Sequence, residues 1–173
     1  SWFGSDLRCG TCSVQPRVEK KAFDGGNMPW RVSGLRRSQA QEMPLQDGRP
    51  IYGGTPTDRS VIEAIRAVHA AGKEVMFYPF ILMDIPVGNA LAQPAYPWRG
   101  RMTCDPAPGE PGSPDKTAAV TAQVDAFVGT ASPADFSVSG GEVVYSGPSE
   151  WSLRRMVLHY AKLCALAGGV DTF

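Results

Sequence analysis

The sequence predicts an α/β fold, and three observations support that prediction. Residues 74–84 form a nearly continuous apolar run, which is typical of a strand buried on both faces. An amphipathic helix pattern ends at Gly72, so helix and strand together make half of a βαβ repeat. Connections after the strands are long, whereas connections after the helices are short. This asymmetry favours a TIM-barrel-like (β/α) fold, in which loops after the strands carry the functional site.

The first half of the chain is predicted to hold two short strands and one helix. Residues 1–4 resemble the end of a strand, and residues 5–28 form a polar connection without helical period. Residues 30–33 are a short strand candidate. The first helix begins at Thr57 or Asp58, since both residue types cap helices. Its apolar residues recur at helical spacing: Val61, Ile62, Ile65 and Val68.

The second half adds two helices and an inserted β-hairpin. Ser113, followed by proline and aspartate, marks the start of the second helix. A Gly-Gly pair within residues 136–145 predicts the hairpin. The third helix begins after Ser149, with Arg154 and Arg155 expected on its outer face. Its expected inward face comprises Leu153, Val157, Tyr160, Ala161 and Cys164.

The chain has 173 residues, enough for one hydrophobic core. Both ends resemble interrupted core strands, so we expect residues 1–173 to be a single fragment with the early to middle βα units of a partial barrel. The outer strands of such a fragment need a covering partner. A doubly wound sheet is the alternative fold, but no glycine-rich nucleotide-binding motif is present.

Composition excludes several classes of function. The 17 basic and 17 acidic residues cancel, whereas general nucleic-acid or anionic-membrane binders carry a basic excess. No apolar run is long enough to cross a bilayer. The two histidines, His69 and His159, lie within predicted helices and form no spaced ligand pair, so we expect neither a metal nor a cofactor.

The four cysteines have different expected roles. Cys164 falls on the apolar side of a helix and is expected in the core. Cys9 and Cys12 form a C-x-x-C pattern, but no thioredoxin-like βαβ pattern follows it. In an oxidising environment Cys104 could form a disulfide with either Cys9 or Cys12, and the sequence leaves that choice open.

Two carboxylates are candidates for catalysis. Asp6 and Asp84 each follow a predicted parallel strand, so a barrel would place both at the same rim. Two carboxyl groups separated by roughly 5–10 Å can act as acid and base, or acid and nucleophile, in glycoside hydrolysis. The competing interpretation is structural, because an aspartate at a strand end commonly caps a turn or pairs with an arginine. Available partners are Arg8, Arg99 and Arg101.

Aromatic and cationic residues near that rim are candidates for substrate binding. Aromatic rings could stack on sugars, and arginines could bind a carboxylated or phosphorylated glycan. These candidates are Tyr78, Tyr96, Trp98, Arg99 and Arg101.

Six segments together resemble the glycoside-hydrolase-like TIM-barrel domain of the baseplate hub protein at the tail tip of gene transfer agents and siphophage-like particles. The segments are residues 2–10, 52–58, 77–86, 93–101, 151–161 and 167–173. The resemblance implies a virion component assembled with other tail-tip and baseplate proteins, released from a bacterium, and facing bacterial surface glycans. It implies a hydrolase-like fold without establishing activity.

Two functions follow as expectations. The first is a structural and recognition module, with carbohydrate binding but no bond cleavage. The second is an active glycoside hydrolase that cuts envelope polysaccharide or peptidoglycan during entry.

Overall fold

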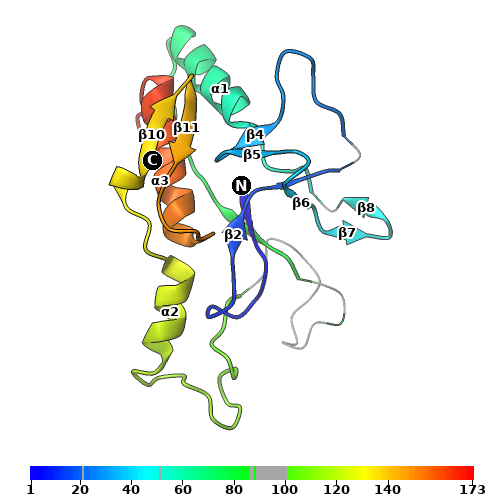
Figure 1. Cartoon of the computed structure of the whole chain (residues 1–173), viewed down its shortest axis with the longest axis vertical. Helices are drawn as coiled ribbons and strands as arrows, with labels where there is room; N and C mark the ends of the chain where they lie inside the picture. The colour runs from blue at the N-terminus through cyan, green and yellow to red at the C-terminus, as the bar shows by residue number, and fades with distance from the viewer. Residues whose placement is uncertain (21, 51, 86–87, 89–100) are drawn as a thin grey trace.

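The computed structural model describes residues 1–20, 22–50, 52–85, 88 and 101–173 (Figure 1). This part of the chain is a mixed α/β structure with three α-helices and five small sheets. Within it there is no barrel-like alternation of eight strands and helices, so the predicted TIM-barrel-like fold is wrong. The physical reason lies in the long polar connections, which pair into two-residue ladders instead of further βα repeats.

The largest sheet has the strand order β2-β1-β9. Strand β1 (Trp2–Gly4) pairs antiparallel with β2 (Val14–Gln15) and parallel with β9 (Ile81–Met83). In the parallel pair Phe3 lies opposite Leu82. The predicted strand at residues 74–84 is therefore real and parallel to the N-terminal strand, although only its last part forms a regular ladder.

The other edge of the same extended segment pairs with the C-terminal residues. Met76 and Thr172 form a parallel bridge, in which the Phe77 amide donates to the Thr172 carbonyl at 2.8 Å. On the β1 side the bonds involve even-numbered residues, since the Trp2 amide donates to the Phe80 carbonyl and the Asp84 amide to the Gly4 carbonyl. Successive residues of a strand direct their backbone hydrogen-bonding groups to opposite edges, so odd-numbered and even-numbered residues serve different neighbours. Residues 75–84 thus lie between two parallel neighbours.

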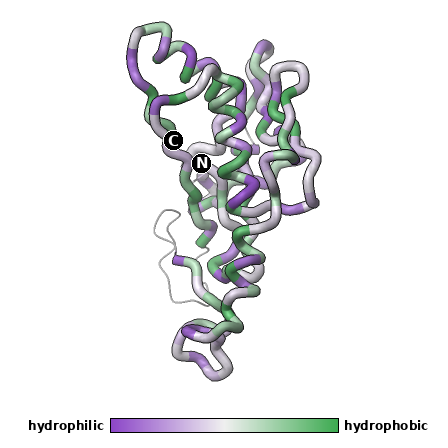
Figure 2. The backbone as a smooth tube through the Cα atoms, turned by 90° about the vertical axis from the view of Figure 1, so that its left-hand side faces the viewer, coloured by the Kyte–Doolittle hydropathy of each residue, from purple (hydrophilic) through white to green (hydrophobic). Residues whose placement is uncertain are grey.

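Helices α1 (Asp58–Ala70) and α3 (Leu153–Ala167) pack against each other; α3 also contacts β2 of this sheet, and α1 lies beside β4 (Figure 1). The predicted stripe of α1 is confirmed in part: Ile62 and Ile65 are buried, whereas Val68 is exposed. Figure 2 shows polar and apolar residues interspersed along the helical parts of the chain, as expected for helices with one buried face.

The buried face of α3 agrees with the prediction at Tyr160 and Cys164 but not at Leu153 and Val157, which are half-buried, or at Ala161, which is exposed. Its N-cap is Ser152, whose side chain accepts from the Arg155 amide, rather than Ser149. Its buried residues recur at positions three and four apart: Arg155, Met156, His159, Tyr160, Leu163, Cys164 and Ala167. Arg155, expected outside, is buried because its guanidinium lies between two aromatic rings, 3.6 Å from the Trp151 centroid and 4.0 Å from the Tyr145 centroid. Arg154 is exposed, as predicted.

Helix α2 (Val120–Val128) begins later than predicted, because Ser113 accepts from the Asp115 amide and the chain turns there. The helix has no fully buried residue. It lies below α1 and α3 in Figure 1 and contacts α3, and its Phe127 packs against the main core. A short 3₁₀ turn, η1 (Pro133–Asp135), leads from it to the hairpin.

The predicted hairpin is confirmed as β10 (Phe136–Ser139) paired antiparallel with β11 (Glu142–Tyr145). Gly140 and Gly141 both have positive φ, as a type I′ turn requires. The hairpin packs against α3.

Residues 17–50 form three two-stranded ladders. Strands β3 (Arg17–Val18) and β6 (Gln41–Glu42) are parallel. The other two ladders are antiparallel and pair β4 (Arg31–Val32) with β5 (Leu35–Arg36), and β7 (Leu45–Gln46) with β8 (Arg49–Pro50). Strand β4 matches the strand predicted at residues 30–33. Among the described residues, no helix has the length and apolar character needed to cross a membrane.

Candidate functional site

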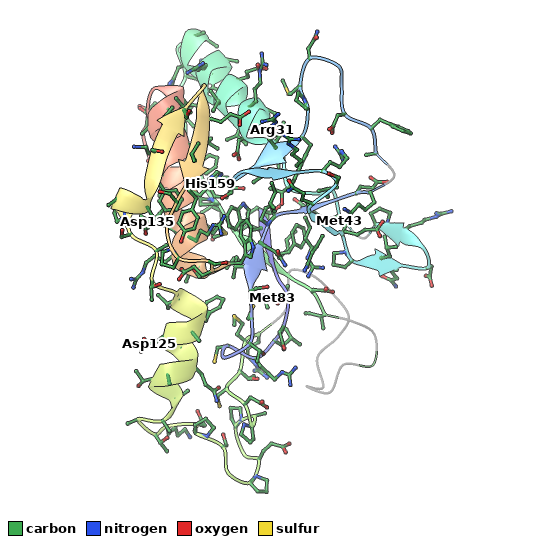
Figure 3. The ribbon with its side chains drawn as sticks, viewed as in Figure 1. Arg31, Met43, Met83, Asp125, Asp135 and His159 are labelled. Atoms are coloured by element: carbon green, nitrogen blue, oxygen red, sulfur yellow. The ribbon has the colours of Figure 1, made fainter. Side chains whose placement is uncertain are left out.

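The two candidate catalytic carboxylates lie at the same end of the central sheet. Asp84 directly follows Met83, the last residue of β9, which is labelled in Figure 3. Asp6 follows β1 by two residues. Since β1 and β9 are parallel, both carboxylates lie beyond the carboxyl ends of adjacent strands. The prediction also placed both acids at one edge of parallel strands, but the described residues form no barrel around them.

Asp6 is held by its neighbours. The Arg8 guanidinium donates through Nη2 to Oδ2 at 2.8 Å and through Nε to Oδ1 at 3.0 Å, while the Thr11 hydroxyl donates to Oδ2 at 2.8 Å. Partial burial acts to raise the pKa of Asp6, but these hydrogen bonds, the Arg8 amide and the Arg8 charge outweigh it and lower the pKa. Asp6 is therefore ionised at neutral pH and is unsuited to be a proton donor.

Asp84 forms an ion pair with Arg17, whose Nη1 donates to Oδ2 of Asp84 at 2.7 Å. The Arg17 side chain is only 7% exposed, and its guanidinium lies 6.0 Å from the centre of the Phe3 ring. An arginine partner for Asp84 was predicted, but from Arg8, Arg99 or Arg101. Arg17 was missed because it lies 67 positions away in a polar connection, where no periodicity or spacing indicates the contact.

The two ion pairs limit the chemistry of this edge. Glycoside hydrolysis requires one carboxyl group that is protonated and another that is free to attack or to activate water. Here each carboxylate already accepts charge-assisted hydrogen bonds from an arginine. The geometry favours the structural interpretation for both residues.

A second feature of this sheet is an exposed apolar row. Residues 74–80 alternate in exposure, and the outward-facing side chains are Met76 at 76%, Tyr78 at 80% and Phe80 at 38%. We call these three residues, Met76 and the two aromatic residues Tyr78 and Phe80, the aromatic stripe. The Tyr78 and Phe80 rings are stacked, with their centroids 6.4 Å apart. On the opposite face the Phe77 ring packs against the Tyr160 ring of α3, with the two ring centroids 5.3 Å apart.

The same face is covered further along the strands. Phe3 and Leu82, which continue the alternation, are fully buried against Met43, labelled in Figure 3. Parallel strands are normally covered on both faces, and contiguous exposed apolar residues mark interaction sites. The aromatic stripe is therefore the described surface that best fits a binding role, and Tyr78 is its one residue named as a candidate from the sequence.

The other predicted binding residues do not gather with Tyr78. Arg101 is exposed and lines a separate cavity beside α2. Tyr96, Trp98 and Arg99 lie outside the described residues. Met76 and Phe80 were missed because an apolar run gives no sign of which face lacks a cover.

The histidines are used structurally. His159 is fully buried, and its Nε2 lies 3.0 Å from Oδ1 of Asp58. His69 lies 3.3 Å from the Asp171 carboxylate. Across the described ranges, no group of three or more His, Cys, Asp or Glu side chains could hold a metal ion.

Comparison of the sequence with protein-family models finds no match, and comparison with curated proteins finds none either.

Proposed function

We propose that this chain is a structural and recognition module of a phage-tail-like hub protein of the gene transfer agent type. In this proposal it lies at the tail tip among other baseplate proteins, and its aromatic stripe contacts bacterial envelope glycans. The six resembling sequence segments support the placement. The observation that carries the recognition role is the stacked pair of exposed rings, Tyr78 and Phe80.

The pairing of both carboxylates supports binding without cleavage. Arg8 keeps Asp6 ionised, and Arg17 engages Asp84 from a nearly buried position. Aromatic rings, by contrast, bring a large apolar face to a ligand at low conformational cost, and Tyr adds a polar group at its edge. An exposed ring pair can therefore bind sugar rings by stacking.

Replacing Tyr78 with alanine tests the recognition role. We expect the variant to bind purified envelope polysaccharide about fivefold more weakly than wild type, since a ring contact contributes roughly 1 kcal/mol. Binding is measured by isothermal titration calorimetry, with circular dichroism to verify folding. Phe23→Ala is the matched control, because Phe23 is 96% exposed and lies outside the stripe. Equal binding by the Tyr78 variant and wild type would disprove the role of the stripe.

An active glycoside hydrolase is the second candidate, favoured by the position of Asp6 and Asp84 beyond adjacent parallel strands. Asp84→Asn separates the two functions. We expect wild type and variant alike to release no reducing ends from envelope polysaccharide or peptidoglycan, because Asp84 serves the Arg17 ion pair. Cleavage by wild type that disappears in a folded Asp84→Asn variant would establish the hydrolase instead.

A further inference from the structure

We propose that Cys9 and Cys104 form a reversible disulfide, and that Cys12 and Cys164 take no part in it. This inference concerns a modification site and does not rest on the proposed function. It selects one of the two pairings that the sequence left open for Cys104.

The backbone brings Cys9 and Cys104 together. Arg8 and Thr103 form a parallel bridge, in which the Thr103 amide donates to the Leu7 carbonyl at 2.7 Å and the Cys9 amide donates to the Thr103 carbonyl at 2.9 Å. Cys9 and Cys104 directly follow the two bridged residues. Paired strands lie roughly 4.7–4.9 Å apart, so two residues that directly follow a bridged pair fall within the Cα span that a disulfide requires.

The two side chains also share surroundings. Both line the same cavity of about 690 Å³, which is closed on another side by Val124 and Phe127 of α2. The Cys9 sulfur lies 3.8 Å from Oε1 of Gln123. Gln123 in turn bonds both backbone groups of Asp105, the residue after Cys104. The Cys9 thiol is thus held next to the chain segment that carries Cys104.

The contacts that each thiol makes now are weak and replaceable. The Cys104 sulfur donates to the Pro106 carbonyl at 3.3 Å and lies 3.6 Å from the Ser113 hydroxyl. Thiols are weak hydrogen-bond donors, so rotating either cysteine side chain about its Cα–Cβ bond gives up little hydrogen-bond energy. The cavity gives a small oxidant a route to both sulfur atoms.

The other two cysteines lie in different surroundings. Cys12 belongs to the main hydrophobic core, where its sulfur lies beside Gly4 near Met83. Burial raises the pKa of the Cys12 thiol and raises that of Cys164 to about 11. Cys164 is on the buried face of α3, away from both. Neither thiol lines the cavity that Cys9 and Cys104 share.

The reaction is a thiol–disulfide exchange with a small disulfide such as oxidised glutathione. The thiolate of one cysteine attacks the glutathione disulfide, forming a mixed disulfide and releasing one glutathione thiol. The second cysteine then attacks the protein sulfur of that mixed disulfide and releases the other glutathione. The protein loses two hydrogen atoms, and one glutathione disulfide is reduced to two thiols.

Intact mass spectrometry and peptide mapping test the pairing in the folded full chain. After treatment with oxidised glutathione, free thiols are alkylated without reduction. Before alkylation we expect a mass lower by two hydrogen atoms than that of the reduced protein. After alkylation under denaturing conditions we expect two alkyl groups instead of four, on Cys12 and Cys164, and a peptide that links Cys9 to Cys104. Because the map is made on the wild-type protein, it does not depend on any variant folding. A Cys12–Cys104 peptide, a covalent dimer, or four free thiols would each overturn the proposal.

Matched variants extend the test. Cys9→Ser and Cys104→Ser should abolish the internal cross-link, whereas Cys12→Ser and Cys164→Ser should keep it. The disulfide would close the stretch of residues 9–104 into a covalent loop, so oxidation should raise the melting temperature of wild type by roughly 5–10 °C. The same treatment should leave the melting temperature of Cys9→Ser unchanged. A rise of the same size in Cys9→Ser would contradict the assignment.

Discussion

Replacing Asp58 with alanine is expected to lower the free energy of unfolding by about 3 kcal/mol. Asp58 begins α1 and is buried, with its two oxygens in use: Oδ1 lies 3.0 Å from Nε2 of His159, and Oδ2 accepts from the Ser33 amide at 3.0 Å. The alanine variant leaves a fully buried imidazole and a buried amide without partners. Chemical denaturation followed by circular dichroism measures the loss.

Asp125→Ala is the matched control for this prediction. Asp125 is an exposed residue of α2, labelled in Figure 3, and its replacement should change the free energy of unfolding by less than about 0.5 kcal/mol. If Asp58→Ala lowers the free energy of unfolding as little as the control does, the contact between α1, α3 and the β4–β5 turn does not stabilise the fold.

Replacing Arg155 with alanine should destabilise the protein by a similar amount, about 3 kcal/mol. The guanidinium stacks between the Trp151 and Tyr145 rings, and its Nη1 donates to the Glu150 carbonyl at 2.6 Å. Burial lowers the pKa of Arg155 to about 10, because a charge is costly to desolvate, so the side chain remains cationic at neutral pH. Alanine removes both ring contacts and leaves a cavity between α3 and the hairpin.

Two further substitutions show whether shape or charge matters. Arg155→Lys keeps the charge but not the planar group that fits between two rings, and should recover no more than about half of the lost stability. Arg154→Ala, at the exposed neighbouring position, should stay within about 0.5 kcal/mol of wild type. Full recovery in Arg155→Lys, measured by the same denaturation, would mean that stacking contributes little.

Local patterns predicted the individual elements with different success. The hairpin was predictable because two glycines with positive φ specify its turn. The stripe of α1 was predicted for Ile62 and Ile65, while α2 was placed too early, since a capping residue such as Ser113 also stabilises an isolated turn.

The global fold was not predictable from the same patterns. Periodicity describes a single element, whereas a barrel requires many elements to repeat in register. The polar connections contain strand segments only two residues long, such as β3 and β6, which no sequence period can indicate. The asymmetry in loop lengths therefore suggested a barrel that the described chain does not form.

By itself the sequence determined the apolar strand, the three helices, the hairpin turn and the position of two acids after parallel strands. Only the tertiary structure decided that Arg17 pairs with Asp84, that Arg155 is buried between two rings, and that the side chains of the aromatic stripe are exposed. The reason is range: helix and turn formation depend on neighbours within a few residues, whereas ion pairs and exposed faces depend on which distant segments the folded chain brings together.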